Sequence, residues 1–245
     1  MKAMILAAGM GTRLGPLTKD KPKALVEIAN RPLLALLLTK LRSQEITGVV
    51  VNAYHRADQI ERFVKEEAFP DGWVRVLIEE RLLGTGGGVR NAARLLGGEE
   101  PVLVHNVDVL SNLPFRRIAG AHEAASALAT LAVGTRRSGR SLAADEEGYL
   151  CGRWGEPPVR SPRGELRRFA YNGIQFLARG AAASLPGEGA FSIIDSCLEW
   201  ASRREEVRVF PMDDWYWAEA GTVERLERLK QDLARRAIPI ESLAS

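Results

Sequence analysis

The chain has 245 residues, of which 46% are hydrophobic and 27% charged. This is the composition of a globular protein and excludes a disordered or fibrous one. Its 34 basic and 31 acidic residues are interspersed and leave a formal net charge of +3, so no nucleic-acid partner is expected.

The first half of the chain alternates short apolar runs with helical patterns. The apolar runs predict strands over about 2–8, 48–52, 74–79 and 102–106. The segments between and after them predict helices over about 32–44, 57–67, 87–96 and 114–123. This alternation is typical of a parallel sheet with helices on both faces, so it predicts a three-layer α/β/α fold.

The pattern changes after another buried strand, predicted over 126–133. The segment 142–159 is rich in glycine, proline and charged residues, and it predicts a small antiparallel excursion that makes the sheet mixed but still mostly parallel. Further strands are predicted over 170–177 and as a last strand pair over 207–210 and 215–218. Helices are predicted over 192–201 and 223–236, the first with Ser192 and Asp195 in place to cap it.

The two cysteines, Cys151 and Cys197, lie far apart in the sequence. Their spacing fits neither a disulfide framework nor a metal site, and it indicates a reducing compartment in which both simply pack. No apolar run approaches the roughly 20 residues of a membrane helix, and no signal peptide follows the start. We therefore predict a cytoplasmic protein with no membrane partner.

The most informative stretch is LAAGMGTRLGPLTKDKPK, from Leu6 to Lys23, directly after the first predicted strand. Its three glycines let the backbone turn sharply and bring N–H groups close to an anion, and Arg13 and Lys23 add positive charge. A polyphosphate is the predicted ligand; a solvated glycine-rich turn is the alternative. A dinucleotide fingerprint would need a glycine at Leu14, and a Walker A loop would need Gly-Lys-Ser/Thr, so neither motif fits.

This stretch resembles the signature LAAGxGTRLxPLTxxxPK of sugar-phosphate nucleotidyltransferases at every specified position. The resemblance implies a Rossmann-like, GT-A-like fold. The opening MKAMILAAG and a TGGG loop make the chain most similar to short N-acetylmuramate-1-phosphate uridylyltransferase-like members. It also implies that Lys23 bridges the phosphates and the acceptor, and that Lys23 and Arg13 are catalytic. The residues of the loop that are expected to bind the nucleotide are Leu6, Ala7, Ala8, Gly9, Gly11, Thr12 and Arg13.

The resemblance extends over about 2–229, nearly the whole chain. It implies a single nucleotidyltransferase domain over 1–236, followed by a C-terminal tail over 237–245. We expect the nucleotide-binding half to span about 1–125 and the sugar-phosphate-binding half about 126–236. The excursion at 142–159 is expected to carry acceptor specificity.

Two further motifs contribute to the implied nucleotide site. GTGGG, from Gly84 to Gly88, opens a predicted helix and looks like the family's second nucleotide-facing loop, with Gly86 and Gly87 as contacts; a flexible turn is the alternative. Asp108, in HNVDVLSN, follows the fourth predicted strand, where open α/β sheets bind their ligands. The resemblance makes it a catalytic residue and a Mg²⁺ ligand, although Val107 stands where much of the family has glycine.

WYWAEAGT, over 215–222, looks like the family's strand that ends in Trp-x-Asp-x-Gly-Thr. Glu219 stands at the position of the second metal-binding aspartate. Glutamate is one methylene longer and Mg²⁺ demands near-octahedral geometry, so Asp213 or Asp214 is an alternative ligand, unless both are solvated loop residues. His105 is expected to satisfy a buried hydrogen bond and not to bind a metal.

FAYNGIQFL, over 169–177, resembles the family's strand that presents Asn-Gly to the sugar. Asn172 and Gly173 are therefore the expected sugar-phosphate-binding residues, together with Lys23. A turn or a bulge in an edge strand is the alternative for the same two residues.

The implied reaction transfers a nucleoside monophosphate from an NTP, UTP first, to a sugar 1-phosphate, with Mg²⁺ as the cofactor and pyrophosphate as the other product. It belongs to nucleotide-sugar biosynthesis for cell-wall or glycan precursors. The expected assembly is a monomer or a small homo-oligomer. One rival is a catalytically inactive nucleotide or nucleotide-sugar binding protein, suggested by Glu219 and Val107. The other is a dinucleotide-dependent oxidoreductase, which the misplaced third glycine argues against.

Overall fold

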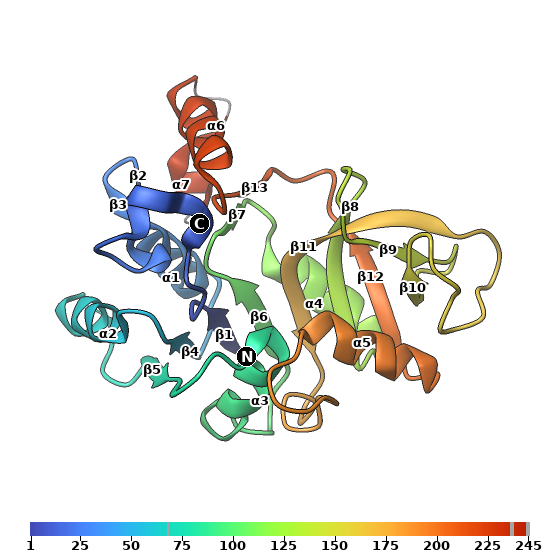
Figure 1. The fold of residues 1–245 in the computed structure, drawn as a ribbon. Coiled ribbons are helices and arrows are strands. Elements are labelled where there is room, and N and C mark those ends of the chain that lie inside the picture. Colours follow the sequence, from blue (N-terminus) through green and yellow to red (C-terminus); the bar gives the residue numbers. More distant parts are fainter. Residues whose placement is uncertain (68, 236–237, 244–245) are drawn as a thin grey trace. The chain divides into compact units, whose positions relative to one another are not determined.

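The computed structural model describes residues 1–67, 69–235 and 238–243 of the chain. The chain divides into two compact units (Figure 1). The first contains Met1–Leu82, His105–Asn112 and Trp215–Ser245, and the second contains Leu83–Val104 and Leu113–Asp214.

The first unit is built on parallel strands joined by helices. Strands β1 (Lys2–Leu6), β4 (Gly48–Ala53) and β5 (Val74–Ile78) pair in that order. Helix α1 (Leu33–Ser43) connects the first two, and α2 (Ala57–Glu66) connects the second and third. Because β1 and β4 are covered on both faces, their apolar residues run continuously instead of alternating with polar ones.

Short elements complete the first unit. They are the 3₁₀ helices η1 (Thr12–Thr18) and η2 (Lys23–Leu25), the hairpin of β2 (Glu27–Ile28) and β3 (Arg31–Pro32), the antiparallel pair β7 (Val109–Ser111) and β13 (Trp217–Glu219), and helices α6 (Val223–Ala234) and α7 (Ile240–Leu243). A core that includes Leu14, Leu36, Leu110 and Leu226 joins the glycine-rich loop to α1, β7 and α6. Burying such leucines stabilises the fold by about 1.5–3 kcal/mol each.

The second unit carries a mixed sheet. Strand β11 (Arg167–Leu177) pairs antiparallel with β8 (Ala129–Gly134) and with β9 (Ser141–Ala144). Strand β9 pairs antiparallel with β10 (Leu150–Arg153), and β8 pairs parallel with β12 (Val207–Pro211). The helices of this unit are α3 (Gly84–Leu96), α4 (Phe115–Ala124) and α5 (Ile193–Ser202). Strand β6 (Val102–Asn106) contains the point where the chain passes into the first unit.

The predicted α/β class, with a mixed sheet and flanking helices, is confirmed, and so is the antiparallel excursion, which is the β9–β10 hairpin. One prediction was wrong. The segments over 207–210 and 215–218 do not form a strand pair, because β12 pairs with β8 whereas β13 pairs with β7. Of the segment expected to be a tail, Ile238 and Leu243 are buried in the core of the first unit.

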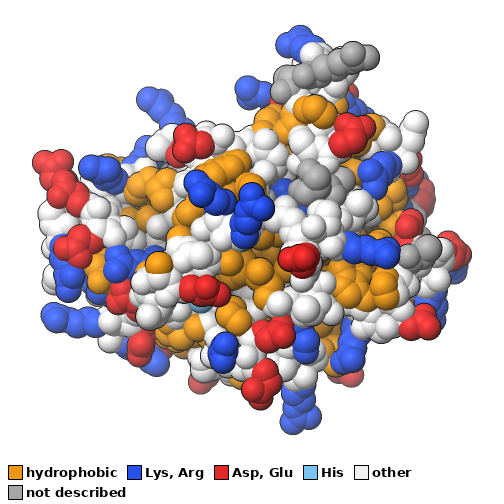
Figure 2. All heavy atoms as spheres, turned by 180° about the vertical axis from the view of Figure 1, so that it is seen from behind, with side chains coloured by type: hydrophobic (Ala, Val, Ile, Leu, Met, Phe, Trp, Pro, Cys, Tyr) orange, Lys and Arg blue, Asp and Glu red, His pale blue; other side chains and the backbone are white. Residues whose placement is uncertain are grey.

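Cys151 and Cys197 are free and buried, and burial raises the pKa of their thiols to about 11 and about 12. None of the helices in the described ranges combines the length and apolar character that a membrane crossing requires. On the face drawn in Figure 2, basic and acidic side chains are interspersed with apolar ones.

Candidate functional site

The glycine-rich loop begins where β1 ends, and backbone conformation fixes its course. Gly11 has φ of 68° and Gly15 has φ of 52°, values that side-chain-bearing residues rarely adopt. The hydroxyl of Thr18 donates to the carbonyl of Gly11 at 3.0 Å and lies 3.2 Å from that of Gly15. The loop is therefore held from within by contacts of its own residues.

A buried polar chain fixes the start of the loop. The backbone N–H of Ala7 donates to Oδ1 of Asn52 at 2.8 Å, and the amide of Asn52 donates to Oε1 of Glu79 at 2.6 Å. Asn52 lies near the end of β4, Glu79 directly follows β5, and both are almost fully buried. Gly9 is exposed, and a Cβ built on it would meet nothing within 4 Å. The backbone at Gly9 is thus open to close approach.

A cavity of about 620 Å³ lies against the same loop. Its lining includes Met10, Thr12 and Lys19 from the loop and His55 from the segment after β4. Thr12 and Arg13 are exposed. The loop therefore offers accessible hydrogen-bond donors and positive charge beside an open space.

Asp108 lies in the turn between β6 and β7, close to the end of β1. The N–H of Val107 donates to the carbonyl of Leu6 at 3.2 Å, which ties this turn to the start of the glycine-rich loop. Lys23 forms an ion pair with Oδ2 of Asp108, and both side chains are mostly buried. The loop lysine and the predicted metal ligand are therefore direct partners.

Glu219 is brought to Asp108 by the β7–β13 pair. It stands opposite Val109 in the register, and the N–H of Ala220 donates to the carbonyl of Asp108 at 2.8 Å. A Cβ on Gly221 would stand 2.3 Å from Oε1 of Glu219 and 3.2 Å from Oδ2 of Asp108. The two carboxylates therefore lie close to each other, and metal binding by them stays a prediction.

Glu219 also has basic partners. Its Oε1 lies 3.8 Å from Nη2 of Arg13, and its Oε2 is paired with Arg225. Arg225 reaches it because Thr222 begins α6 immediately after the turn, and the hydroxyl of Thr222 accepts from the N–H of Arg225 at 3.3 Å. Each carboxylate thus has an arginine or lysine as its counterion.

Two buried basic side chains lie behind this turn. His105 has its Nδ1 2.8 Å from the carbonyl of Asn106, and burial lowers its pKa to about 4, so the ring is neutral at pH 7. This is the buried hydrogen bond expected of it. Lys40 of α1 is 1% exposed and donates to the carbonyl of Ser111, and burial lowers its pKa to about 7. Lys40 therefore links α1 to β7.

In the second unit, Asn172 and Gly173 lie in a bulge. Tyr171 pairs with Val133 and Gln175 with Leu131, so three residues of β11 stand opposite one of β8. Gly173 has φ of 77°, a value that favours glycine within this irregular segment. A bulge is therefore present, but β11 is not the edge strand of that alternative, because Ala170 pairs with Gly134 of β8 and with Ser141 of β9. Sugar-phosphate binding by Asn172 and Gly173 stays a prediction.

The GTGGG segment forms the first turn of α3 and packs closely on Phe191. The N–H of Gly86 donates to the carbonyl of Phe191 at 3.0 Å, and Oγ1 of Thr85 accepts from the N–H of Ile193 at 2.9 Å. A Cβ on Gly86 would stand 2.3 Å from the Phe191 ring. Packing therefore accounts for Gly86. Nucleotide contact by Gly86 and Gly87 stays a prediction.

The other acidic candidates have local roles. Oδ1 of Asp213 accepts from the N–H and the hydroxyl of Thr135 at 2.9 and 3.0 Å, so Asp213 is an ordered side chain. Asp214 is exposed. Asp195 pairs with Arg153, whereas the cap of α5 is Ser192.

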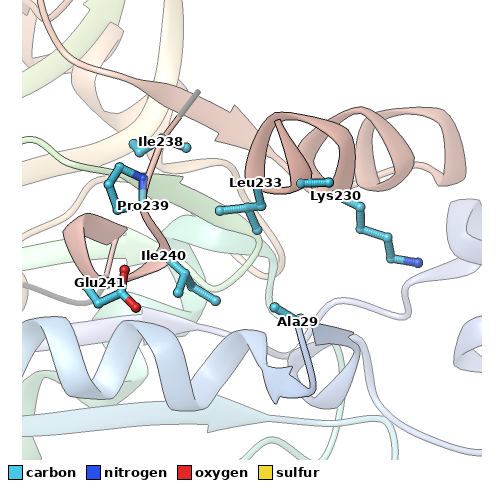
Figure 3. Close-up of a pocket in the computed structure, with 8 residues that line it drawn as sticks. Ala29, Lys230, Leu233, Ile238, Pro239, Ile240 and Glu241 are labelled. Carbon is cyan, nitrogen blue, oxygen red and sulfur yellow. The ribbon is translucent and has the colours of Figure 1, made fainter. Parts of the chain in front are cut away.

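A cavity of about 680 Å³ lies elsewhere in the first unit, between α6, α7 and the β2–β3 turn (Figure 3). Its lining is mostly apolar, from residues such as Leu233, Ile238 and Ile240. None of the predicted site residues lines it. This apolar cavity is therefore separate from the predicted site.

The structure brings most of the predicted site into the first unit: Leu6, Ala7, Ala8, Gly9, Gly11, Thr12, Arg13, Lys23, Asp108 and Glu219. Gly86, Gly87, Asn172 and Gly173 belong to the second. Asn52, Glu79 and Arg225 stand in no motif of the sequence that marks them as site residues. The Gly-Thr before α6 was a usable signal for the start of that helix. No local sequence pattern predicted the ion pair between Arg225 and Glu219.

Comparison with known proteins gives partial alignments to two kinds of enzyme. An N-acetylmuramate alpha-1-phosphate uridylyltransferase of Caulobacter vibrioides is 44% identical over 109 residues, which cover 43% of this chain and 45% of that protein. A mannose-1-phosphate guanyltransferase of Aspergillus oryzae is 36% identical over 125 residues, 50% of this chain and 34% of that protein. The match spans less than half the length of either relative.

Solved structures match over more of the chain. HddC from Yersinia pseudotuberculosis has a TM-score of 0.74 at 21% identity, and the match covers 95% of this chain and 99% of that one. Its complex with GMP-PN has a TM-score of 0.73 at 22% identity, again with 95% and 99% covered. At these identities the likeness shows a shared fold. The model of the nucleotidyl transferase family matches residues 2–236, almost the whole chain, and the protein is therefore a member of that family.

Proposed function

We propose that this protein transfers a nucleoside monophosphate from an NTP to a sugar 1-phosphate and releases pyrophosphate. The observation that carries the proposal is the convergence of Asp108 and Glu219 at the end of the glycine-rich loop, with Lys23 and Arg13 against them. Family membership and the sugar-phosphate substrates named for the relatives support the same reaction.

The basic residues of the loop suit a polyphosphate. Arg13 is exposed and presents a planar fork of donors, and Lys23 is a compact ammonium at the buried end of the loop. Backbone N–H groups around Gly9 add donors that need no side-chain rearrangement. In the proposed reaction these groups hold the triphosphate and offset the repulsion between two anionic substrates.

The two carboxylates suit Mg²⁺. Within the described ranges no group of three or more His, Cys, Asp or Glu residues is arranged to hold a metal ion. Asp108 and Glu219 would hold Mg²⁺ together with phosphate oxygens and water. A bound Mg²⁺ would neutralise charge on the phosphates. Lys23 must then leave Asp108, and the phosphates are the partner that the sequence predicts for it.

The nucleophile requires no general base. The second pKa of a phosphomonoester is about 6, so a sugar 1-phosphate is already largely dianionic at pH 7. One of its phosphate oxygens attacks the α-phosphorus, and the bond from that phosphorus to the pyrophosphate oxygen breaks in line. Arg13, Lys23 and the loop backbone would hold the two substrates in position and offset their negative charge.

UTP is the nucleotide that the family resemblance favours, with N-acetylmuramate 1-phosphate as the acceptor. GTP is the competing nucleotide because guanyltransferases also align with the chain. For the acceptor side we propose Lys23, Asn172 and Gly173.

The test is coupled pyrophosphate release with Mg²⁺. Each of the four NTPs and dTTP is crossed with N-acetylmuramic acid, N-acetylglucosamine, glucose, mannose and heptose 1-phosphates. Release that needs one NTP and one sugar phosphate together is expected. Asp108→Asn should lower kcat at least about 100-fold because one metal oxygen and its charge are lost. Asp71→Asn, an exposed acid of the same unit, is the control.

One observation favours a second candidate, a nucleotide-binding protein without catalysis. Glu219 already has two basic neighbours, Arg13 and Arg225, which compete with a metal for its oxygens. NTP binding by calorimetry without pyrophosphate release from any pair would select this candidate. Glu219→Asp, which restores the family's carboxylate, would then be the variant expected to gain activity.

A further inference from the structure

A cluster of polar side chains lies at the end of β8 in the second unit. It consists of Gly134, Thr135, Arg136, Asn172 and Asp213, and we call it the β8-end cluster. The members come from β8, the loop after it, the β11 bulge and the loop after β12. Arg136 and Asp213 were not assigned to acceptor binding by the sequence.

Arg136 fixes the orientation of Asn172. Its Nε donates to Oδ1 of Asn172 at 3.2 Å, and its Nη2 donates to the carbonyl of Tyr171 at 2.8 Å. The planar guanidinium thus hydrogen-bonds to both a side chain and a backbone carbonyl of the bulge. Asn172 is 4% exposed, so its amide is held in one orientation.

Asp213 is fixed by one oxygen only. The N–H and the hydroxyl of Thr135 both donate to its Oδ1. Among the described residues none donates a hydrogen bond to its Oδ2. Because the residue is exposed, this carboxylate oxygen is oriented by the protein and accessible from solvent.

Gly134 lets these groups meet. A Cβ built on it would stand 3.1 Å from Nδ2 of Asn172 and 3.2 Å from Oδ1 of Asp213. Gly134 does not have a positive φ, so its backbone would accept alanine. Glycine at this position therefore leaves room for the side chains of Asn172 and Asp213 to come close together. The backbone conformation of β8 does not itself require a glycine here.

We propose that the β8-end cluster recognises ring hydroxyls of the acceptor sugar, with Asp213 as the specificity-determining acceptor and Arg136 as the positioning residue for Asn172. This inference rests on the proposed function, since it names how the acceptor is read. A carboxylate oxygen accepts strongly from a hydroxyl, and a fixed amide beside it adds direction. The group that Asp213 contacts is a ring hydroxyl and not a phosphate or a carboxylate, because the charge of Asp213 would repel an anion.

The test uses Asp213→Asn and Gly134→Ala with the sugar 1-phosphate and NTP pair that is most active in the panel. Asp213→Asn keeps an oxygen for Thr135 but replaces the accessible carboxylate, and Gly134→Ala forces the two side chains apart. Both should raise KM for the sugar 1-phosphate about 10-fold and leave KM for the NTP within about twofold. Glu188→Gln, an exposed acid of the same unit, is the matched control.

Deoxy analogues of the active sugar provide the sharper readout. With one analogue, KM of the wild type should rise by about the same factor as Asp213→Asn raises KM for the intact sugar. KM of Asp213→Asn should rise no further with that analogue. Arg136→Lys should raise the sugar KM while the melting temperature changes little. Unchanged sugar KM in Asp213→Asn and Gly134→Ala, or equal increases in both KM values, would overturn the proposal.

Failure of the proposed function is distinguishable from failure of this inference. If the wild type releases no pyrophosphate with any pair, calorimetry with the same sugar 1-phosphates replaces kinetics. Binding that Asp213→Asn weakens about 10-fold would support the β8-end cluster as a sugar site without transfer. No binding, or equal binding by both proteins, would reject it.

Discussion

At the scale of single residues, the carboxylates of Asp108 and Glu219 can lie close together because Gly221 has no side chain. A Cβ on Gly221 would stand 2.3 Å from Oε1 of Glu219. Gly221 does not have a positive φ, so Gly221→Ala should fold and should displace Glu219. We expect kcat to fall at least about 10-fold, by about 1.4 kcal/mol in the barrier, and steady-state kinetics with a thermal melt measures both effects. Gly120→Ala, where a Cβ meets nothing within 4 Å, is the control; full activity of Gly221→Ala would contradict the placement.

Lys40 should make stability depend on pH. Burial lowers its pKa from 10.5 to about 7. Below about pH 7 both the folded and the unfolded chain carry the charge, and the folded state bears the full penalty of burying it. Between about pH 7 and pH 10 the unfolded chain binds a proton that the folded chain lacks, so the contribution of Lys40 to the free energy of unfolding rises with pH.

Lys40→Met removes this contribution. The free energy of unfolding of the variant minus that of the wild type should therefore fall from about pH 7 to about pH 10, as measured by urea denaturation at several pH values. Lys65→Met, at an exposed position of α2, should give a difference independent of pH. A flat difference for Lys40→Met would show that its ammonium has an ordinary pKa.

Candidate residues of the site could be nominated from the sequence where they lie in contiguous motifs. Arg13, Lys23 and Asp108 stand in stretches whose residue types and order suffice to nominate them. Arg225 and Arg136 do not, because their partners lie across a turn or on another strand. The preference of an arginine for a carboxylate or an amide oxygen is general, and only tertiary structure selects which one it meets.

At the scale of elements, the first turn of α3 and the segment around Phe191 form one packed contact. The Phe191 ring lies where a Cβ of Gly86 would stand, and Arg90 donates to the carbonyl of Gly187 at 2.6 Å with its guanidinium 4.7 Å from the ring centre. Gly86→Ala should therefore lower the free energy of unfolding by about 1–3 kcal/mol, measurable by urea denaturation.

A double-mutant cycle separates this contact from helix propensity. Phe191→Ala leaves space, so Gly86→Ala should cost less in that background by at least about 1 kcal/mol. Gly98→Ala, where a Cβ meets nothing within 4 Å, should be nearly neutral. Additive effects of Gly86→Ala and Phe191→Ala would contradict the contact.

Elements were predictable in proportion to their length. Agreement within a few residues is found for strands β1, β4, β5 and β6 and for helices α1, α2 and α5. Each of these helices shows the helical repeat of apolar residues over several turns, and each of these strands is a continuous apolar run. The β2–β3 hairpin, β7 and α7 were missed, since two to four residues cannot express a period. Pairing partners of β12 and β13 depend on long-range register, which the sequence does not display.

At the scale of the whole molecule, the chain passes back and forth between its two units. Residues 105–112 and 215–245 join the first unit although they are distant from residues 1–82 in sequence. A division of the sequence near residue 125 treats each half as contiguous, so it does not follow the compact units. The assignment of a nucleotide half and a sugar-phosphate half stays a prediction about function.

Ligand binding should stabilise the whole molecule through the pair Asp108 and Glu219. A ligand at about 100 times its Kd raises the free energy of unfolding by about 2.7 kcal/mol, which is a rise of about 5–10 °C in Tm for a chain of this size. We expect this rise with the preferred NTP and Mg²⁺ together and a much smaller one with NTP and a chelator.

Two variants locate the effect in a differential melt. Asp108→Asn should abolish the Mg²⁺-dependent part of the shift, because the ion loses a charged ligand, while the shift from NTP alone should persist through Arg13 and the loop backbone. Asp71→Asn should behave as the wild type. An equal shift in Tm with and without Mg²⁺ in the wild type would mean that Lys23 and Arg225 stay paired with Asp108 and Glu219. Mg²⁺ would then not bind to these two carboxylates.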